Sequence, residues 1–344
     1  QYSALDGLAA DWHLMHWGNL LNGGAGLFII EATGVLPEGR ISPGCLGLWD
    51  DATEAAMGDT LHRARALAPT TPVCIQLSHA GRKASSAAPW HGGQQLTKAQ
   101  GGWEAFGPSA LPHLPHETPP TAMPPDYLIQ VREAFVAAAR RAQRIGVDAV
   151  ELHAAHGYLL HQFLSPLANQ RTDAYGGNFE NRIRYVMEVF AAVRQGFQGS
   201  LGVRLSATDW VDGGWDIAQS EVLAQRLKAA GCDFIHVSSA GVSSLQKIAV
   251  GPNFQVPFAQ QIRAASGMAT LAVGMITEAR QAEAILQAGD ADLIALARAF
   301  LYQPRWGWQA AAALGGTVTA REAYWRCLPR EAQAIFGKVS IGMR

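Results

Sequence analysis

Seven short apolar runs recur along the chain, and longer segments with helical periodicity separate them. The runs are apolar nearly throughout instead of alternating with polar residues, a pattern typical of parallel strands that are covered on both faces. They span Leu27–Glu31, Val73–Leu77, Ala149–His153, Gly202–Leu205, Phe234–Val237, Thr270–Val273 and Leu293–Ala297. Helices are expected between them at Asp50–Leu67, Asp126–Ile145, Asn178–Phe197, Gln219–Ala230, Pro257–Ala265 and Glu278–Ala288. This alternation without a linker predicts a parallel α/β fold.

The length of the chain fits one large barrel. It has 344 residues, of which 49% are hydrophobic, so a substantial core can be buried. A (β/α)8 TIM barrel has eight strands and begins with one. The first element here, from Asp11 to about Leu21, has the pattern of a helix. We therefore expect an α/β (β/α)8 TIM barrel whose first strand would precede Gln1 and is absent from this chain, with residues 1–344 forming a single domain.

Two segments interrupt the strand–helix rhythm. Residues 81–125 are rich in Gly, Pro, Ser and His and contain Trp90, Trp103 and Phe106. A loop of this length in a compact domain is usually functional, so we predict that it lies over the active site. Residues 312–344 are expected to form a C-terminal extension.

Charge and cysteine usage narrow the classes of partner. The net charge of −1 argues against nucleic acid or an anionic membrane surface. The chain has no apolar stretch of membrane-spanning length, and its opening residues lack the basic region of a signal peptide. Its four cysteines lie far apart, which fits reduced thiols in a cytoplasmic protein better than a disulfide framework or a zinc site.

The most informative motif runs from Glu151 to Tyr158, where a predicted strand ends. Barrels place their chemistry at this end of the strands. Two imidazoles three residues apart, His153 and His156, can donate N–H groups to one oxygen, polarise a carbonyl and stabilise the enolate formed when a hydride adds at the β carbon. The Tyr158 phenol can supply a proton to the α carbon.

Two other interpretations of this motif stay open. The histidines can be ligands of a metal-dependent hydrolase, although Ala154 stands where the H-E-x-x-H motif has its glutamate. They can also be buried histidines with structural hydrogen bonds.

Polar residues at other strand ends suit a phosphorylated, planar cofactor. Gly274 and Arg298 follow the last two strands, where barrels commonly bind phosphate. Gln76 offers a donor and an acceptor to a heterocycle, and Arg204 can place a cation beside a flavin. The structural alternatives are a plain turn at Gly274, backbone hydrogen bonds for Gln76 and an interior ion pair for Arg204.

Taken together, these motifs resemble the old yellow enzyme family, and within it the bacterial thermophilic-like branch. The likeness runs from residue 1 to about residue 305. The stretches that carry it are Gln1–Ala4, Glu31–Thr33, Gln76–Lys83, His153–Tyr158, Arg171–Gly177, Val203–Ser206 and Val273–Thr277. The resemblance implies an FMN-bearing ene-reductase in which NADPH or NADH reduces the flavin and a small activated alkene, such as an α,β-unsaturated carbonyl, reoxidises it.

The resemblance also assigns roles to particular residues. It implies that the isoalloxazine is held by Ala32, Gln76 and Arg204, and the ribityl phosphate by Gly274, Met275, Ala297 and Arg298. His153 and His156 would bind the substrate oxygen, and Tyr158 would be the proton donor. The remaining substrate contacts would come from Tyr2, Lys83, Trp306 and Arg326. Arg326 would reach the site of a neighbouring subunit, which implies a homodimer or homotetramer.

The chain departs from the family pattern in three places, one of which is a C-terminal tail longer than the typical ending of this branch. The Pro-Met-Cys-like segment that carries a flavin-tuning cysteine in this branch does not precede Gln1, and Ala297 replaces the usual glycine. The rival hypotheses are therefore a metal-dependent barrel hydrolase that uses His153 and His156, and a non-catalytic barrel.

Overall fold

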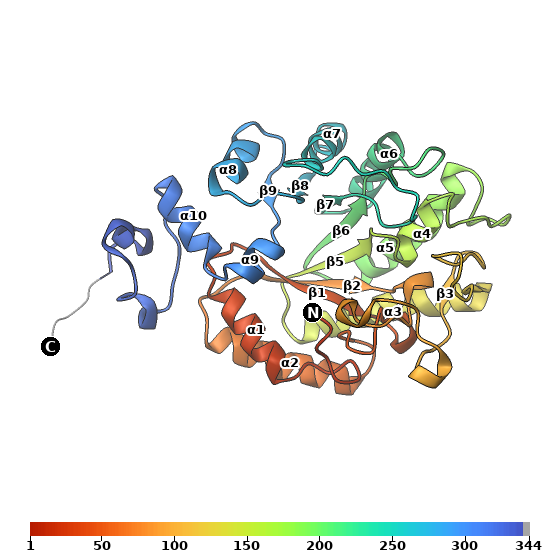
Figure 1. The fold of residues 1–344 in the computed structure, drawn as a ribbon, viewed down its shortest axis with the longest axis horizontal. Coiled ribbons are helices and arrows are strands. Elements are labelled where there is room, and N and C mark those ends of the chain that lie inside the picture. The colour runs from red at the N-terminus through yellow and green to blue at the C-terminus, as the bar shows by residue number, and fades with distance from the viewer. Residues whose placement is uncertain (340–344) are drawn as a thin grey trace.

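A computed structural model describes residues 1–339 as a curved parallel sheet surrounded by helices (Figure 1). The sheet order is β1-β2-β5-β6-β7-β8-β9, and every neighbouring pair is parallel. Strand order therefore follows chain order, as in a TIM barrel. The strands are β1 (Phe28–Gly34), β2 (Val73–Ser78), β5 (Ala149–Ala154), β6 (Ser200–Ser206), β7 (Phe234–Ser238), β8 (Ala269–Ala272) and β9 (Leu293–Ile294). All seven predicted strands are present.

The seven-stranded sheet does not close into a complete barrel. Within residues 1–339, β1 and β9 are the two edges of the sheet and do not pair. The C-terminal helices α9 (Arg298–Tyr302) and α10 (Trp306–Leu314) instead lie beside α1 (Asp11–Leu21) in Figure 1. Arg305 Nη1, between α9 and α10, donates to the carbonyl oxygen of Asn19 at 2.9 Å.

The outer helices bury one face of the sheet. They are α2 (Asp51–Ala66), α3 (Pro125–Arg144), α5 (Phe179–Gly196), α6 (Ile217–Ala229), α7 (Val256–Ser266) and α8 (Ala279–Gln287). Strand side chains on this outer face, among them Ile75, Val150 and Val203, are wholly buried in the main apolar core. The predicted helices are thus confirmed to within a few residues.

The inner face of the sheet changes from apolar to polar along the strands. An apolar cluster of Cys74, Ala149, Phe234 and Leu271 fills one end of the interior. Successive residues of a strand point to opposite faces, so the residues two positions further on face the same interior. Three of these are polar and buried, namely Gln76, Glu151 and His236. Strands β2, β5 and β7 therefore each carry a buried polar group beyond the apolar end of the interior.

Several elements lie outside the main strand–helix alternation. Short helix α4 (Leu159–Leu164) follows β5. The segment 81–125 contains 3₁₀ turns and a small parallel pair, β3 (Phe106–Gly107) and β4 (Thr121–Ala122). Its turns are η2 (Gly81–Lys83), η3 (Pro89–His91) and η4 (Lys98–Gln100); another, η1 (Pro37–Gly39), follows β1.

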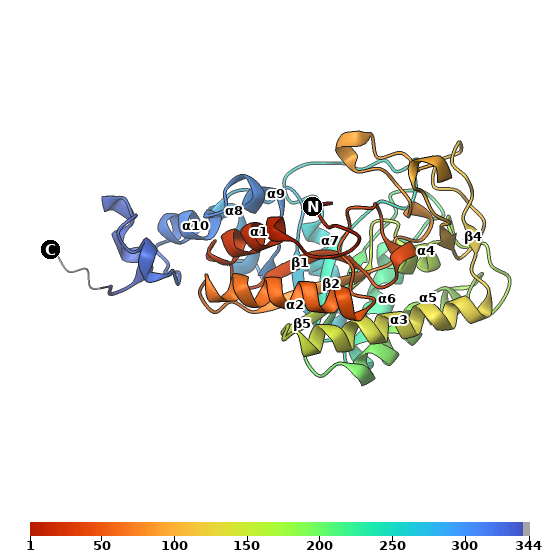
Figure 2. The same cartoon turned by 90° about the horizontal axis from the view of Figure 1, so that it is seen from below.

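Beyond α10 the chain forms two 3₁₀ turns, η5 (Glu322–Tyr324) and η6 (Arg330–Phe336). They project away from the barrel in both Figure 1 and Figure 2. The last five residues of the predicted extension 312–344 lie outside the described residues. In the described part of the chain, every helix falls short of the length and hydropathy needed to cross a membrane.

Candidate active site

The predicted histidine motif forms a compact cluster at the end of β5. The imidazole rings of His153 and His156 have centroids 5.1 Å apart and planes that are nearly perpendicular, at 86°. The ring of Tyr158 lies 4.8 Å from that of His153. The structure therefore brings together the three residues that the sequence proposed as catalytic.

A left-handed turn gives this loop its shape. His156 has φ +58° and Gly157 has φ +73°. A Cβ atom at Gly157 would lie 2.1 Å from the carbonyl oxygen of Gly241, so only glycine fits there. The Gly157 N–H donates to Nδ1 of His161 at 2.9 Å, and Gln162 Nε2 donates to the Gly157 carbonyl at 2.7 Å. Side chains of α4 thus hold the turn that presents His156.

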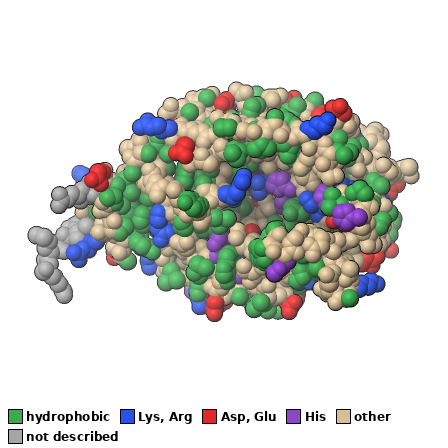
Figure 3. Space-filling view, viewed as in Figure 1, with side chains coloured by type: hydrophobic (Ala, Val, Ile, Leu, Met, Phe, Trp, Pro, Cys, Tyr) green, Lys and Arg blue, Asp and Glu red, His purple; other side chains and the backbone are tan. Residues whose placement is uncertain are grey.

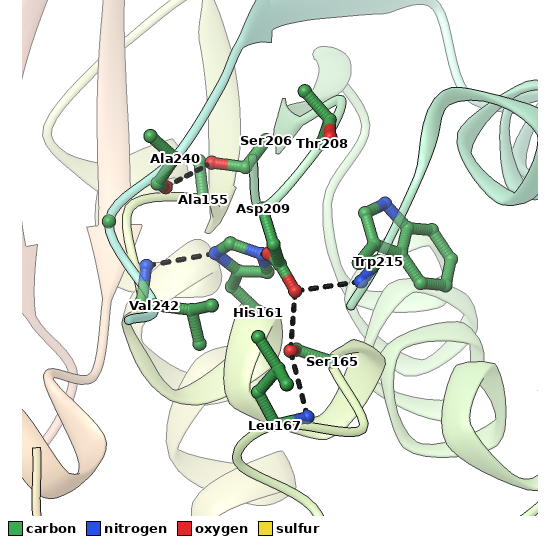
Figure 4. A network of polar contacts seen from close by, with 12 residues as sticks. Ala155, His161, Ser165, Leu167, Ser206, Thr208, Asp209, Trp215, Ala240 and Val242 are labelled. Atoms are coloured by element: carbon green, nitrogen blue, oxygen red, sulfur yellow. Dashed lines mark hydrogen bonds and ion pairs between the residues drawn. The ribbon is translucent and has the colours of Figure 1, made fainter. Parts of the chain in front are cut away.

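A buried carboxylate anchors His161 in turn (Figure 4). Asp209 Oδ1 lies 2.8 Å from His161 Nε2. Its Oδ2 accepts from Ser165 Oγ at 2.6 Å and from the Trp215 backbone N–H at 2.7 Å. Burial raises the pKa of Asp209, but its interaction with His161 and its hydrogen bonds from Ser165 and the Trp215 N–H outweigh burial and hold that pKa below its usual value.

Each active-site imidazole is neutral and uses one ring nitrogen within the protein. Burial, reinforced by Arg204, holds the pKa of both His153 and His156 well below the usual value. His153 Nδ1 accepts the Ala155 N–H at 3.2 Å, which places the ring proton on Nε2. His156 Nε2 lies 2.7 Å from Ser238 Oγ. Within residues 1–339, His153 Nε2 and His156 Nδ1 have no protein partner.

Lys83 and Tyr158 complete the polar rim. Lys83 Nζ donates to the carbonyl oxygens of His156 at 3.0 Å and Gly241 at 3.2 Å, and it lies 5.2 Å from the Tyr158 ring centroid. Burial, followed by the charge of Arg82, lowers the pKa of Lys83 to about 8. Burial, with a smaller contribution from Tyr2, raises the pKa of the Tyr158 phenol. Tyr158 therefore keeps its proton across the physiological range.

A cavity of about 850 Å³ runs between the unpaired edge strands β1 and β9 and extends into the interior of the sheet as far as Arg204, the residue aligned with His153 on the neighbouring strand. Ala32, Gln76, Arg204, Ala297 and Trp306 line it, so five residues from the predicted cofactor and substrate sets share one space. Figure 3 shows a hollow in this face of the molecule with Lys or Arg and His side chains around it.

Buried polar atoms in the cavity wall lack partners. They are Oε1 of Glu31, Nε of Arg204 and Nε2 of His236, considering residues 1–339. Buried polar groups are normally hydrogen-bonded, so unpaired atoms around one cavity indicate a ligand with its own donors and acceptors. The polar edge of a flavin ring fits these residues.

The predicted phosphate-binding residues follow β8 and β9, and only Ala297 among them also lines the cavity. Gly274 has φ +112° and Met275 has φ +53°, so the chain turns sharply after β8. A Cβ atom at Gly274 would lie 2.3 Å from Nε2 of Gln255, which itself donates to the Val273 carbonyl. Arg298 begins α9 and is exposed to solvent.

The other predicted substrate residues are more scattered. Tyr2 packs edge-on against Trp90 of the 81–125 segment, with ring centroids 5.7 Å apart. Trp306 donates from Nε1 to the Thr277 carbonyl at 2.9 Å and lies at the cavity wall. Arg326 is exposed on the projecting C-terminal segment, and this chain does not bring it to its own histidines.

Several buried residues of the site were not predicted. Asp209 and His161 support the histidine loop, and His236 shares Glu151 with Gln76. Glu151 and His236 could have been identified from the sequence, since each is a polar residue inside an apolar strand. Asp209 lies beyond a strand, and nothing in its local sequence sets it apart.

The fold and the site together define a TIM-barrel flavoenzyme: parallel strands in barrel order, an interior cavity lined by Gln76 and Arg204, and two neutral histidines at a neighbouring strand end. The chain belongs to the NADH:flavin oxidoreductase / NADH oxidase family, whose model matches residues 3–315. It is therefore an oxidoreductase of the old yellow enzyme type, with FMN as its cofactor and NADPH or NADH as the reductant.

Individual relatives agree with this assignment. The chain is 42% identical over 326 residues to an NADH:flavin oxidoreductase of Gibberella zeae, covering 88% of this chain and 78% of the relative. It is 40% identical over 319 residues to an NADPH dehydrogenase of Halalkalibacterium halodurans, covering 93% and 89%. Among solved structures, morphinone reductase is similar with a TM-score of 0.74 and 28% identity, over 92% of this chain and 84% of that one.

Family membership sets aside the two rival hypotheses, the metal-dependent hydrolase and the non-catalytic barrel. The structure adds an observation on the first: no group of three or more His, Cys, Asp or Glu side chains occurs in a metal-binding arrangement within residues 1–339.

Proposed function

We propose that this protein is an ene-reductase that reduces the activated double bond of small α,β-unsaturated carbonyl compounds. The proposal rests on the two neutral imidazoles of His153 and His156, each of which has one ring nitrogen without a partner among residues 1–339. His153 is aligned with Arg204 on the neighbouring strand, and Arg204 lines the cavity. Two N–H donors at one point suit a carbonyl oxygen that gains negative charge during the reaction.

The cofactor would be held by residues of the cavity and of the last two strand ends. Ala32, Gln76 and Arg204 would contact the flavin ring, whereas Gly274, Met275, Ala297 and Arg298 would contact the ribityl phosphate. When bound, FMN that has been reduced by NADPH or NADH supplies a hydride to the β carbon of the alkene.

The two histidines bind and polarise the substrate oxygen. His153 donates from Nε2, because its Nδ1 is occupied by the Ala155 N–H. His156 donates from Nδ1 in the tautomer in which the Ser238 hydroxyl donates to its Nε2. Both donors stabilise the enolate oxygen that forms as the β carbon receives the hydride.

Tyr158 completes the reaction by protonating the α carbon. Its buried phenol keeps its proton at neutral pH and lies beside the histidines. Tyr2, Lys83 and Trp306 would shape the substrate space, and Arg326 would enter it from a neighbouring subunit of a homodimer or homotetramer. All four cysteines are unpaired, which suits a reducing cytoplasm.

A direct test uses the purified protein. We expect a yellow protein whose retained cofactor has the mass of FMN and which consumes NADPH when cyclohexenone is added. A flavin-containing protein that transfers electrons from NADPH only to oxygen or quinones, and never to cyclohexenone or a related enone, would refute the ene-reductase assignment while leaving the family assignment intact.

A further inference from the structure

Glu151 is a fully buried carboxylate that joins two strands across the barrel interior. Its Oε1 accepts from Gln76 Nε2 of β2 at 2.6 Å, and its Oε2 lies 2.9 Å from His236 Nδ1 of β7. Glu151 itself is on β5 and has no exposed surface. Burying a carboxylate is costly unless its charge is balanced and hydrogen-bonded, so this arrangement calls for a function.

The strand register places a cation beside this pair. Arg204 on β6 is aligned with His236 on β7, and both line the same cavity as Glu151. Burial raises the pKa of Glu151, but His236 and Arg204 outweigh burial and hold that pKa below its usual value, so the carboxylate is ionised. Burial and then Arg204 lower the pKa of His236. Neutral His236 therefore donates from Nδ1 to Glu151.

The hydrogen bond to Glu151 also fixes the orientation of Gln76. A carboxylate accepts hydrogen bonds only, so the atom of Gln76 that meets it is the amide nitrogen. The carbonyl oxygen of Gln76 is then the atom left for a ligand in the cavity. A ring N–H of the ligand is the group that this oxygen can accept.

We propose that Glu151 is a positioning residue that orients Gln76 and offsets the charge of Arg204, and that it thereby lowers the reduction potential of the bound flavin. This inference rests on the proposed function, because it takes Gln76 and Arg204 as flavin contacts. Reduction adds negative charge to the flavin, which Arg204 favours and a second buried anion opposes. A lower potential makes the reduced cofactor a stronger hydride donor.

The substitution Glu151→Gln tests the charge because it keeps the size and an acceptor oxygen. We expect the variant to retain FMN and to shift the equilibrium toward reduced flavin about tenfold, which is about 30 mV to more positive potential for two electrons. The potential is measured by equilibration with a reference dye. Glu180→Gln, on the exposed side of α5, removes the same charge and should leave the potential unchanged.

The outcomes separate the two proposals. An FMN-loaded Glu151→Gln protein with the wild-type potential overturns the role of Glu151, even if wild-type protein reduces cyclohexenone. A wild-type protein that holds FMN but reduces no enone refutes the proposed function, while a shifted potential in the variant still supports Glu151.

A second variant decides the matter if Glu151→Gln fails to fold or to hold FMN. His236→Leu leaves the carboxylate in place but removes its donor, so the pKa of Glu151 should rise. The groups that face Glu151 are then Cys74 and Gln76 from β2, Arg204 from β6 and, in the cavity wall, Glu31 from β1. In the His236→Leu variant, we expect the flavin potential to rise more steeply than in wild type as the pH falls, because Glu151 then takes up a proton. A potential–pH profile that matches wild type over the range of about pH 5 to pH 9 overturns the proposal.

Discussion

Nε2 of His161 lies 2.8 Å from Oδ1 of Asp209, and both side chains are fully excluded from solvent. The other ring nitrogen of His161 accepts the N–H of Gly157, the residue that follows His156. One buried pair therefore connects the end of β6 to the turn that carries the substrate-binding histidine. The position of His156 depends on a hydrogen-bond chain outside the substrate space.

Breaking this pair should destabilise the protein strongly. Asp209→Ala leaves His161 Nε2, Ser165 Oγ and the Trp215 N–H without their acceptor, and each buried donor left unsatisfied costs about 1–3 kcal/mol. The free energy of unfolding from urea titration measures the loss. Asp212→Ala, an exposed site on the same loop, is the matched control and should change it by less than about 0.5 kcal/mol. Equal stabilities for the two variants would contradict the anchoring role.

The contribution of Asp209 should depend on pH with a defined sign. Its pKa is lower in the folded protein than in the unfolded chain, so the folded state binds fewer protons. The stabilisation is then present above the unfolded pKa of about 4 and is lost as the pH falls through the folded value. We expect the stability difference between wild type and Asp209→Asn to shrink from pH 6 to pH 3 in urea titrations. A constant difference would show that ionisation of Asp209 does not matter.

Removing one substrate donor should affect turnover and spare the cofactor. His156→Ala deletes one of two N–H groups for the substrate oxygen, and loss of such a donor costs about 10²–10³ in kcat. We expect full FMN content with a loss of that size in cyclohexenone reduction. The exposed His62 of α2 supplies the control, His62→Ala, which should turn over normally. Undiminished turnover in His156→Ala would remove this residue from the site.

The repeating part of the fold was predictable from the sequence because buried parallel strands have a simple pattern. All seven strands were located, and Val73–Leu77 differs from β2 by one residue. The last strand was predicted as Leu293–Ala297 but pairs only at Leu293 and Ile294. Its sequence is apolar, whereas its length is set by how far the neighbouring β8 extends.

The catalytic cluster was predictable, but its supports were not. His153, His156 and Tyr158 lie within one motif, so the end of one strand brings them together. Asp209 reaches His161 across 48 positions of sequence, and local periodicity contains no information on such a contact. Glu151 was predicted only as part of a strand. Its role in the site depends on its hydrogen bonds to Gln76 and His236, which lie on other strands and are not visible in the local sequence.

Tyr158 should matter for protonation and not for cofactor binding. Tyr158→Phe removes the phenol, and a positioned general acid contributes about 10²–10⁴ to the rate. We expect slower reoxidation of reduced flavin by enone in stopped-flow measurements, with unchanged reduction by NADPH. Burial raises the pKa of Tyr158, so the phenol stays protonated. The wild-type rate should therefore show no loss from ionisation of this phenol between about pH 6 and pH 9. Wild-type kinetics in the variant would assign protonation to water.

Arg326 should act only between subunits. It is exposed on the projecting segment after α10, so it does not contact the histidines of its own chain. We expect Arg326→Ala to raise the KM for cyclohexenone and leave FMN content unchanged, since the substitution removes a substrate contact and no cofactor contact. Lys338→Ala, an exposed cation on the same segment, is the control. Mixing Arg326→Ala with the inactive His156→Ala provides the decisive measurement. If the arginine serves the neighbouring site, mixed oligomers contain sites with Arg326 from one chain and His156 from the other, and their KM returns toward the wild-type value. A KM that stays at the Arg326→Ala value in the mixture, or protein that is monomeric at assay concentration, would contradict a shared site.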